Sequence, residues 1–191
     1  MPWSFQNSCS LCAADLAGAD NPCPNCRDGN TSIDGITALG YWSGPLREWL
    51  SGLKYGGDSR LSYWLAECLV SVWNNTYPGL TVVPVPPRRA KLHFGGCDPV
   101  GLIVRRMGVS GVPVGRYLQR RGNKAQKNMT REERLEGRAL NYYVKKVHGF
   151  MPQDLVLLDD VMTTGTTLRS CAAVLKERGA LHVYGMVVCR D

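Results

Sequence analysis

The most informative segment of this 191-residue chain is Val156–Thr167, which reads VLLDDVMTTGTT. The apolar run Leu155–Leu158 is typical of a strand that is buried on both faces of a sheet. A helical pattern over Leu168–Arg178 follows the segment, and a second strand-like run, Leu181–Val188, comes next. Strand, loop, helix and strand in this order predict a parallel sheet with a right-handed crossover. We therefore expect an α/β fold.

Two adjacent carboxylates, Asp159 and Asp160, come at the carboxyl end of the predicted strand. Neighbouring strand residues point to opposite faces, and ligands of open α/β sheets bind beyond the carboxyl ends of strands. The loop Thr163–Thr167 adds hydroxyls, a glycine at Gly165 for a tight turn, and a helix N-terminus that favours an anion. This combination predicts a sugar phosphate site. The alternative is a threonine-rich helix cap beside a solvated aspartate pair.

The string Leu157–Thr167 resembles the phosphoribosyl diphosphate (PRPP) signature of type I phosphoribosyltransferases. The resemblance implies that family's parallel sheet flanked by helices, with Asp159 and Asp160 on the ribose hydroxyls, directly or through a metal. It also implies Mg²⁺ bound together with PRPP, or with another ribose 5-phosphate ligand. The residues expected to bind PRPP are Asp159, Asp160, Val161, Met162, Thr163, Thr164, Gly165, Thr166 and Thr167.

Two arginines, Arg88 and Arg89, follow the proline-rich string Val82–Pro87. The string resembles the stretch before the diphosphate loop of the same superfamily. Guanidinium groups suit diphosphate oxygens, so we expect Arg88 and Arg89 to form the catalytic set together with Asp159 and Asp160. The alternative is a proline-rich turn with two solvated arginines.

Residues 116–138 form a basic segment, with eight basic residues against three acidic ones. Its central part resembles the flexible loop that closes over PRPP, and such a lid would exclude water from a reactive anomeric carbon. The lid residues that we expect to act are Arg120, Gln126, Lys127 and Arg134. The alternatives are a solvated face, or a track for single-stranded DNA with tyrosines 117, 142 and 143 nearby.

Four cysteines near the N-terminus form two Cys-x-x-Cys pairs, Cys9 with Cys12 and Cys23 with Cys26, separated by ten residues. This spacing is typical of a structural Zn²⁺ site with four thiolate ligands. A module of this size cannot bury a core, so the metal would supply its folding energy. The alternatives are free surface thiols or a redox pair.

The order of these elements resembles the ComF family of competence proteins, also called ComFC or GntX-like. A further element, Lys54-Tyr-x-Gly-Asp58, belongs to that resemblance, although a purely structural turn would explain it as well. One departure is Gly95-Gly-Cys-Asp98, where family members often carry Gly-Phe-Asn-Gln. The resemblance implies a role in DNA uptake, with competence-machinery proteins as partners. Three activities stay open: transfer of ribose 5-phosphate to an unknown acceptor, PRPP sensing without turnover, and binding of single-stranded DNA.

Composition places these elements in a folded chain with a net charge of +7, which favours anionic partners. We expect a zinc module over residues 1–34 and a phosphoribosyltransferase-like domain over residues 35–191. The sequence has no signal peptide and no apolar stretch of membrane-spanning length, so we expect a cytoplasmic protein without membrane insertion. Other expected elements are a strand from Ile36, helices over Leu46–Leu53, Leu61–Trp73 and Pro99–Met107, and strands over Thr81–Val85 and Val112–Leu118.

Overall fold

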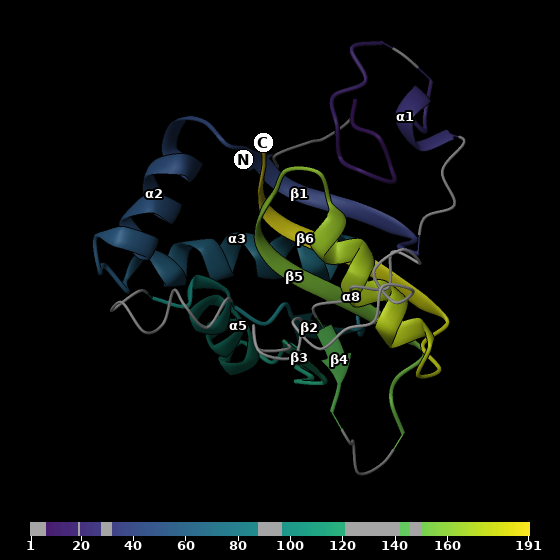
Figure 1. Ribbon diagram of the computed structural model, residues 1–191. Helices are drawn as coiled ribbons and strands as arrows, with labels where there is room; N and C mark the ends of the chain where they lie inside the picture. Colours follow the sequence, from purple (N-terminus) through teal and green to yellow (C-terminus); the bar gives the residue numbers. More distant parts are fainter. Residues whose placement is uncertain (1–6, 19, 28–31, 88–96, 121–141, 146–149) are drawn as a thin grey trace, which may run out of the picture.

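The computed structural model describes residues 7–18, 20–27, 32–87, 97–120, 142–145 and 150–191 (Figure 1). Its centre is a four-stranded sheet in the order β1-β6-β5-β2, in which every neighbouring pair is parallel. A separate antiparallel pair joins β3 to β4. The strands are β1 Gly35–Tyr41, β2 Thr81–Pro84, β3 Leu118–Arg120, β4 Tyr142–Val144, β5 Asp154–Met162 and β6 His182–Arg190.

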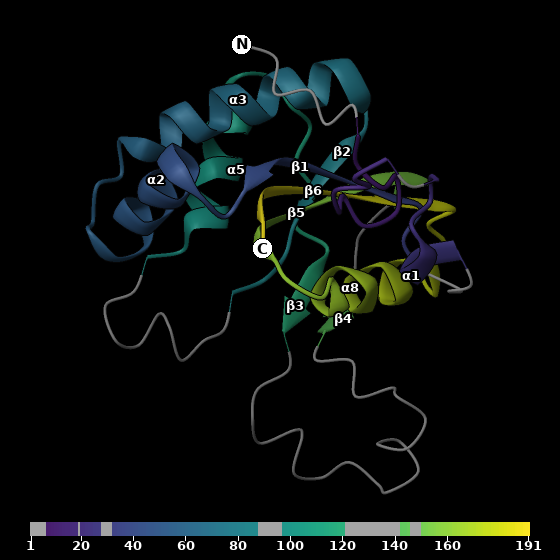
Figure 2. The ribbon, with the colours of Figure 1, turned by 90° about the horizontal axis from the view of Figure 1, so that it is seen from above.

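Helices cover both faces of the sheet, as Figure 2 shows from above: α2, α3 and α5 lie on one face, and α8 lies on the other with the β3–β4 pair. The helices are α1 Pro24–Arg27, α2 Gly44–Tyr55, α3 Leu61–Thr76, α5 Pro99–Val109 and α8 Thr166–Lys176. Each long helix buries one apolar side; α2, for example, buries Leu46, Leu50 and Leu53, which recur at helical spacing. The predicted fold class, a parallel sheet flanked by helices with a four-cysteine module, is confirmed.

Two hydrophobic cores lie on the two faces, and β5 contributes to both by simple alternation. Leu155 and Leu157 pack into the core beneath α8, whereas Val156 and Leu158 pack into the core beneath α2, α3 and α5. All four side chains are fully buried. Successive strand residues point to opposite faces, so the same alternation assigns the next two positions to opposite sides of the sheet.

Two strand predictions differ from the structure at their bounds. The strand predicted over Leu155–Leu158 continues to Met162, because β6 pairs with it as far as Arg190. The strand predicted over Val112–Leu118 is a single bridge to β2, in which Val82 donates to the Pro113 oxygen at 2.8 Å. Pro113 has no N–H to donate, which limits a regular ladder there.

The cysteine module lies against β1 and the end of β6. The Ile36 N–H donates to the Ser10 oxygen at 3.0 Å, and Arg190 donates from Nε to the Cys12 oxygen at 3.0 Å. Ala13 is buried in the core beneath α8. The expected boundary between residues 34 and 35 falls at the start of β1 and stays a prediction. None of the helices in the described part of the chain is long and apolar enough to cross a membrane.

Candidate functional site

A cleft of about 680 Å³ opens where β2 and β5 end, between the last turn of α2 and the first turns of α5 and α8. The segment after β2, Val85–Pro87, forms one wall. The charged residues that line the cleft, within the described part of the chain, are Lys54, Asp98, Arg120, Asp159 and Asp160. This is the edge of a parallel sheet at which ligands of α/β proteins bind.

Asp159 and Asp160 lie in the last part of β5 and are half-buried. The Asp160 carboxylate pairs with the Lys54 ammonium at 2.8 Å, on the face covered by α2. Asp159 belongs to the other face, close to the Cys171 side chain of α8. Burial raises the pKa of the Cys171 thiol, and the charge of Asp159 raises it further. Backbone N–H groups orient both acids, since Asp160 N donates to Asp159 Oδ1 at 2.8 Å and Val161 N donates to Asp160 Oδ1 at 2.6 Å.

The threonine loop after β5 turns directly into α8. Gly165 has a φ of 72°, a left-handed conformation that favours glycine, and an added Cβ there would lie 3.1 Å from the Arg169 guanidinium. The Arg169 side chain donates to the Thr164 backbone oxygen, and the hydroxyls of Thr164 and Thr166 are 2.9 Å apart. The N-cap residue Gly165 has no side chain with which to cap α8, and the Thr166 N–H makes only a long contact of 3.5 Å to the Thr164 hydroxyl. The first turn of α8 can therefore donate hydrogen bonds to an anion.

The β3–β4 pair forms a second wall of the cleft. Arg120 donates to the Tyr142 hydroxyl at 2.9 Å, and its guanidinium carbon lies 5.2 Å from the centroid of that ring. Burial raises the pKa of Tyr142, which is only 4% exposed. Tyr142 therefore holds Arg120 in place and presents no open ring face on which a nucleotide base could stack.

The segment in which this sequence departs from the ComF pattern also borders the cleft. Asp98 accepts from the Gly101 N–H at 2.9 Å and so caps α5, and Cys97 precedes it in the lining. Burial raises the pKa of the Cys97 thiol, and the charge of Asp98 adds to the effect. Residues 95 and 96 lie outside the described residues.

The structure brings together much of the set expected from sequence. One cleft is lined by Asp159, Asp160, Val161, Thr163, Thr167 and Arg120. The same strand and loop also contain Met162, Thr164, Gly165 and Thr166. The roles of five expected residues stay predictions, because these residues lie outside the described part of the chain: Arg88, Arg89, Gln126, Lys127 and Arg134. Sequence reasoning left Lys54 undecided and missed the link from Tyr142 to Arg120. The only signal for Lys54 was its place in the Lys-Tyr-x-Gly-Asp element.

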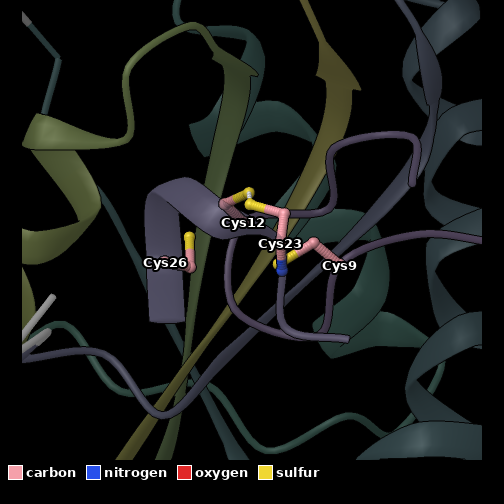
Figure 3. Close-up of side chains that lie close together, drawn as sticks. All are labelled: Cys9, Cys12, Cys23 and Cys26. Carbon is pink, nitrogen blue, oxygen red and sulfur yellow. Dashed lines mark hydrogen bonds between the residues drawn. The ribbon is translucent and has the colours of Figure 1, made fainter. Parts of the chain in front are cut away.

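The four N-terminal cysteines converge (Figure 3): their sulfur atoms all lie within 4.8 Å of one another. Cys26 lies on α1, and the Cys23 N–H donates to the Cys9 sulfur at 3.3 Å. Burial alone would raise the pKa of Cys9, but hydrogen bonds from the backbone of Cys23, Leu11 and Cys12 lower it to about 7. Burial raises the pKa of Cys26. Four clustered sulfurs fit a tetrahedral metal such as Zn²⁺, which would hold all four as thiolates.

Comparison with known proteins finds two curated relatives and no matching family model. The chain is 26% identical over 191 residues to competence protein ComFC of Streptococcus pneumoniae (strain ATCC BAA-255 / R6), covering 92% of this chain and 84% of that protein. It is 26% identical over 136 residues to competence protein ComFC of Bacillus subtilis (strain 168), covering 70% of this chain and 55% of that protein.

Among solved structures, the chain is similar to a hypoxanthine phosphoribosyltransferase from Trypanosoma cruzi in complex with the product IMP. The TM-score is 0.36 at 10% identity, over 76% of this chain and 68% of that one. A second similar structure is an asparagine mutant made to analyse an invariant aspartic acid in HPRTs, with a TM-score of 0.38 at 11% identity, over 74% and 65%. Because both TM-scores are low, we assign the fold from the sheet topology of this chain and not from these two structures.

Proposed function

We propose that this chain, a relative of the ComFC competence proteins, binds phosphoribosyl diphosphate together with Mg²⁺ in the cleft at the end of β5 and acts in DNA uptake. The observation that carries the proposal is the meeting of two kinds of group at one edge of the sheet. Carboxylates approach from both faces of β5, and the N-terminus of α8 follows only a few residues later.

The two kinds of group match the two ends of a ribose 5-phosphate. Ribose hydroxyls donate hydrogen bonds, which Asp159 and Asp160 accept. The 5′-phosphate accepts hydrogen bonds, which the N–H groups and hydroxyls of Thr163–Thr167 donate. The left-handed Gly165 lets the backbone curve round the phosphate without a side chain in the way.

A divalent cation fits this cleft, because carboxylate oxygens are the ligands that Mg²⁺ prefers in proteins. Asp159 would supply such oxygens, either directly or through ordered water, whereas Asp160 already contacts the Lys54 ammonium. When bound, Mg²⁺ would neutralise part of the diphosphate charge. Arg120, held by Tyr142, adds a protein cation on the α8 face.

A transfer reaction at this site would break the bond from the anomeric carbon to diphosphate and form a bond from that carbon to an acceptor. The role of the protein would then be to hold the ribose and to stabilise the charge of the departing diphosphate. The binding proposal stands with or without this turnover, which requires an acceptor that the described residues do not identify.

The test is calorimetric titration of PRPP and Mg²⁺ into zinc-loaded protein, with diphosphate release assayed in the same samples. We expect binding by the wild type, and binding weakened by at least about a hundredfold in Asp159→Asn/Asp160→Asn, because both ribose contacts lose their charge. The matched control is Asp154→Asn, at the opposite end of β5, where Asp154 pairs with His182 at 2.7 Å. No binding by the wild type would refute the proposal. Diphosphate release with a candidate acceptor would establish a transferase.

The role in DNA uptake is proposed from the two curated relatives, both of which are competence proteins. We expect this chain to restore transformation in a Streptococcus pneumoniae strain that lacks ComFC, and we expect the Asp159→Asn/Asp160→Asn variant, expressed at the same level, to fail. Equal restoration by both forms would show that the cleft is not needed for the role. Such a role implies contact with DNA or with proteins of the competence machinery.

A further inference from the structure

Lys54 and Asp160 form the ion pair at the centre of the cleft's α2 face. The Lys54 ammonium lies 2.8 Å from Asp160 Oδ2, and the two side chains are only 10% and 21% exposed. The ammonium also lies 5.7 Å from the centroid of the Trp42 ring. Behind the pair, burial raises the pKa of the Cys189 thiol to about 11, an effect that the Lys54 charge opposes and the Asp160 charge adds to.

This placement differs from that of a surface salt bridge. An ammonium and a carboxylate that are both largely shielded from water interact through a lower effective dielectric than exposed ions do. The pair also comes from two elements that are far apart in the sequence, the last turn of α2 and the end of β5. Lys54 lines the same cleft as the carboxylate that it contacts, so its remaining N–H groups are within the space that a ligand would occupy.

The charge of the cleft depends strongly on this lysine. Among the described residues that line it, two cations (Lys54 and Arg120) face three carboxylates (Asp98, Asp159 and Asp160). Without Lys54, only Arg120 among these described residues would face the same three carboxylates. An anionic ligand would then meet stronger repulsion, whereas a divalent cation would be attracted more strongly.

We propose that Lys54 is the built-in counter-ion of Asp160, taking the place of a metal ion at that carboxylate. It keeps Asp160 charged and oriented for a ribose hydroxyl, and it lowers the need for a divalent cation on the α2 face. This inference rests on the proposed function, because it concerns how the same cleft admits a ribose 5-phosphate ligand. Lys54 is thus a positioning residue whose removal changes the metal dependence of the site.

The first experiment needs no sugar phosphate. Mn²⁺ alone is titrated into zinc-loaded protein, and its binding is followed by electron paramagnetic resonance. We expect weak binding in the wild type and binding at least about tenfold tighter in Lys54→Met, because a contacting opposite charge shifts cation affinity at a carboxylate by roughly this factor or more. Lys54→Gln, which keeps a polar end, provides a second neutral variant should Lys54→Met fold poorly. Lys54→Arg should behave as the wild type does.

Two further variants separate this role from a structural one. Lys54→Met/Asp160→Asn should lose the gain in Mn²⁺ affinity, because the released carboxylate is gone. Lys176→Met removes the lysine of another half-buried pair, 2.7 Å from Asp34 and 28% exposed, outside the cleft, and it should leave Mn²⁺ affinity unchanged. Equal Mn²⁺ affinity in the wild type and both neutral Lys54 variants, or a gain that survives in the double variant, would overturn the proposal.

The second experiment joins the inference to the ligand. With metal chelated and zinc retained, PRPP affinity should fall by at least about tenfold in Lys54→Met, and added Mg²⁺ should restore more of the affinity in the variant than it adds in the wild type. An equal response to Mg²⁺ in the two proteins would contradict the inference. If the wild type binds no PRPP under any condition, the proposed function fails, and the Mn²⁺ titrations still decide the role of Lys54.

Discussion

Arg190, the last residue of β6, donates from its Nε to the backbone oxygen of Cys12 at 3.0 Å. The contact fixes one of the cysteine-bearing turns to a central strand of the sheet, next to β1. The Ser10 oxygen makes a second link by accepting the Ile36 N–H at 3.0 Å. We therefore expect a change at the cysteine cluster, such as the loss of a bound metal, to affect the stability of the sheet edge at β1.

Loss of one metal ligand should abolish metal binding and lower stability. We expect Cys26→Ser to reduce zinc content from about one ion per chain to none, because a closed structural site needs all four ligands. The melting temperature should fall by at least about 4 °C, since the links to Ser10 and Cys12 lose their support. Metal analysis and calorimetry would measure both quantities. Cys68→Ser, outside the cluster, is the control, and zinc retained by Cys26→Ser would contradict the assignment.

Gly165 should be required for the phosphate loop beyond its effect on stability. Alanine there must adopt a left-handed φ of 72° beside the Arg169 guanidinium, so we expect a stability loss of about 1 kcal/mol and PRPP affinity at least about fivefold weaker. Gly179→Ala is matched, because Gly179 also has a positive φ, of 102°, but nothing within 4 Å of an added Cβ. Urea unfolding and calorimetry should show similar stability losses and different affinities. Equal affinities would rule out the loop as the phosphate site.

Tyr142 should contribute to binding through Arg120. Tyr142→Phe removes the hydroxyl that accepts from Arg120 at 2.9 Å, and we expect PRPP affinity to fall by about tenfold because the guanidinium loses its orientation. Tyr143→Phe removes the neighbouring hydroxyl, which donates to Gln119 at the exposed surface, and should change affinity by less than about twofold. If both variants bind as the wild type does, Arg120 does not contact the ligand.

The free energy of unfolding should fall in alkaline solution, because a buried thiol loses its proton at lower pH in the unfolded chain than in the folded one. Burial raises the pKa of Cys189 from 9.0 to about 11. Between these values the unfolded state releases a proton that the folded state retains, so the free energy of unfolding decreases as pH rises, by up to about 1.4 kcal/mol per pH unit. Urea unfolding across that range should show a shallower slope for Cys189→Ala. Val188→Ala opens a cavity in the same strand without removing a thiol and should keep the wild-type slope.

Local sequence patterns were sufficient for the central strands and helices. The periodic segments over Leu61–Trp73 and Pro99–Met107 predicted α3 and α5 with small errors at their ends. The apolar run Leu155–Leu158 located β5 but ended four residues before the strand does, at Met162. The errors arise where pairing overrides composition. Asp159 and Val161, for example, remain in β5 because they pair with Val187 and Cys189 of β6.

Long-range partners could not be predicted in this way. The β3–β4 pair aligns Arg120 with Tyr142 across a long polar segment, and neither three-residue strand has a pattern of its own. Likewise, sequence indicated that the acidic pair needs compensation, but not that Lys54 supplies it for Asp160. Which cation meets which carboxylate depends on how α2 packs, and no local motif records that packing.

Asp159 and Asp160 are joined by one peptide unit but lie on opposite faces of the sheet, each on the side of a different hydrophobic core. A ligand held by both carboxylates would therefore restrain the two helical layers at once. Amide hydrogen exchange would slow in α2, through Lys54, and in α8, through the threonine loop, with the same dependence on ligand concentration. Slowing in one helix alone would mean that only one of the two carboxylates holds the ligand.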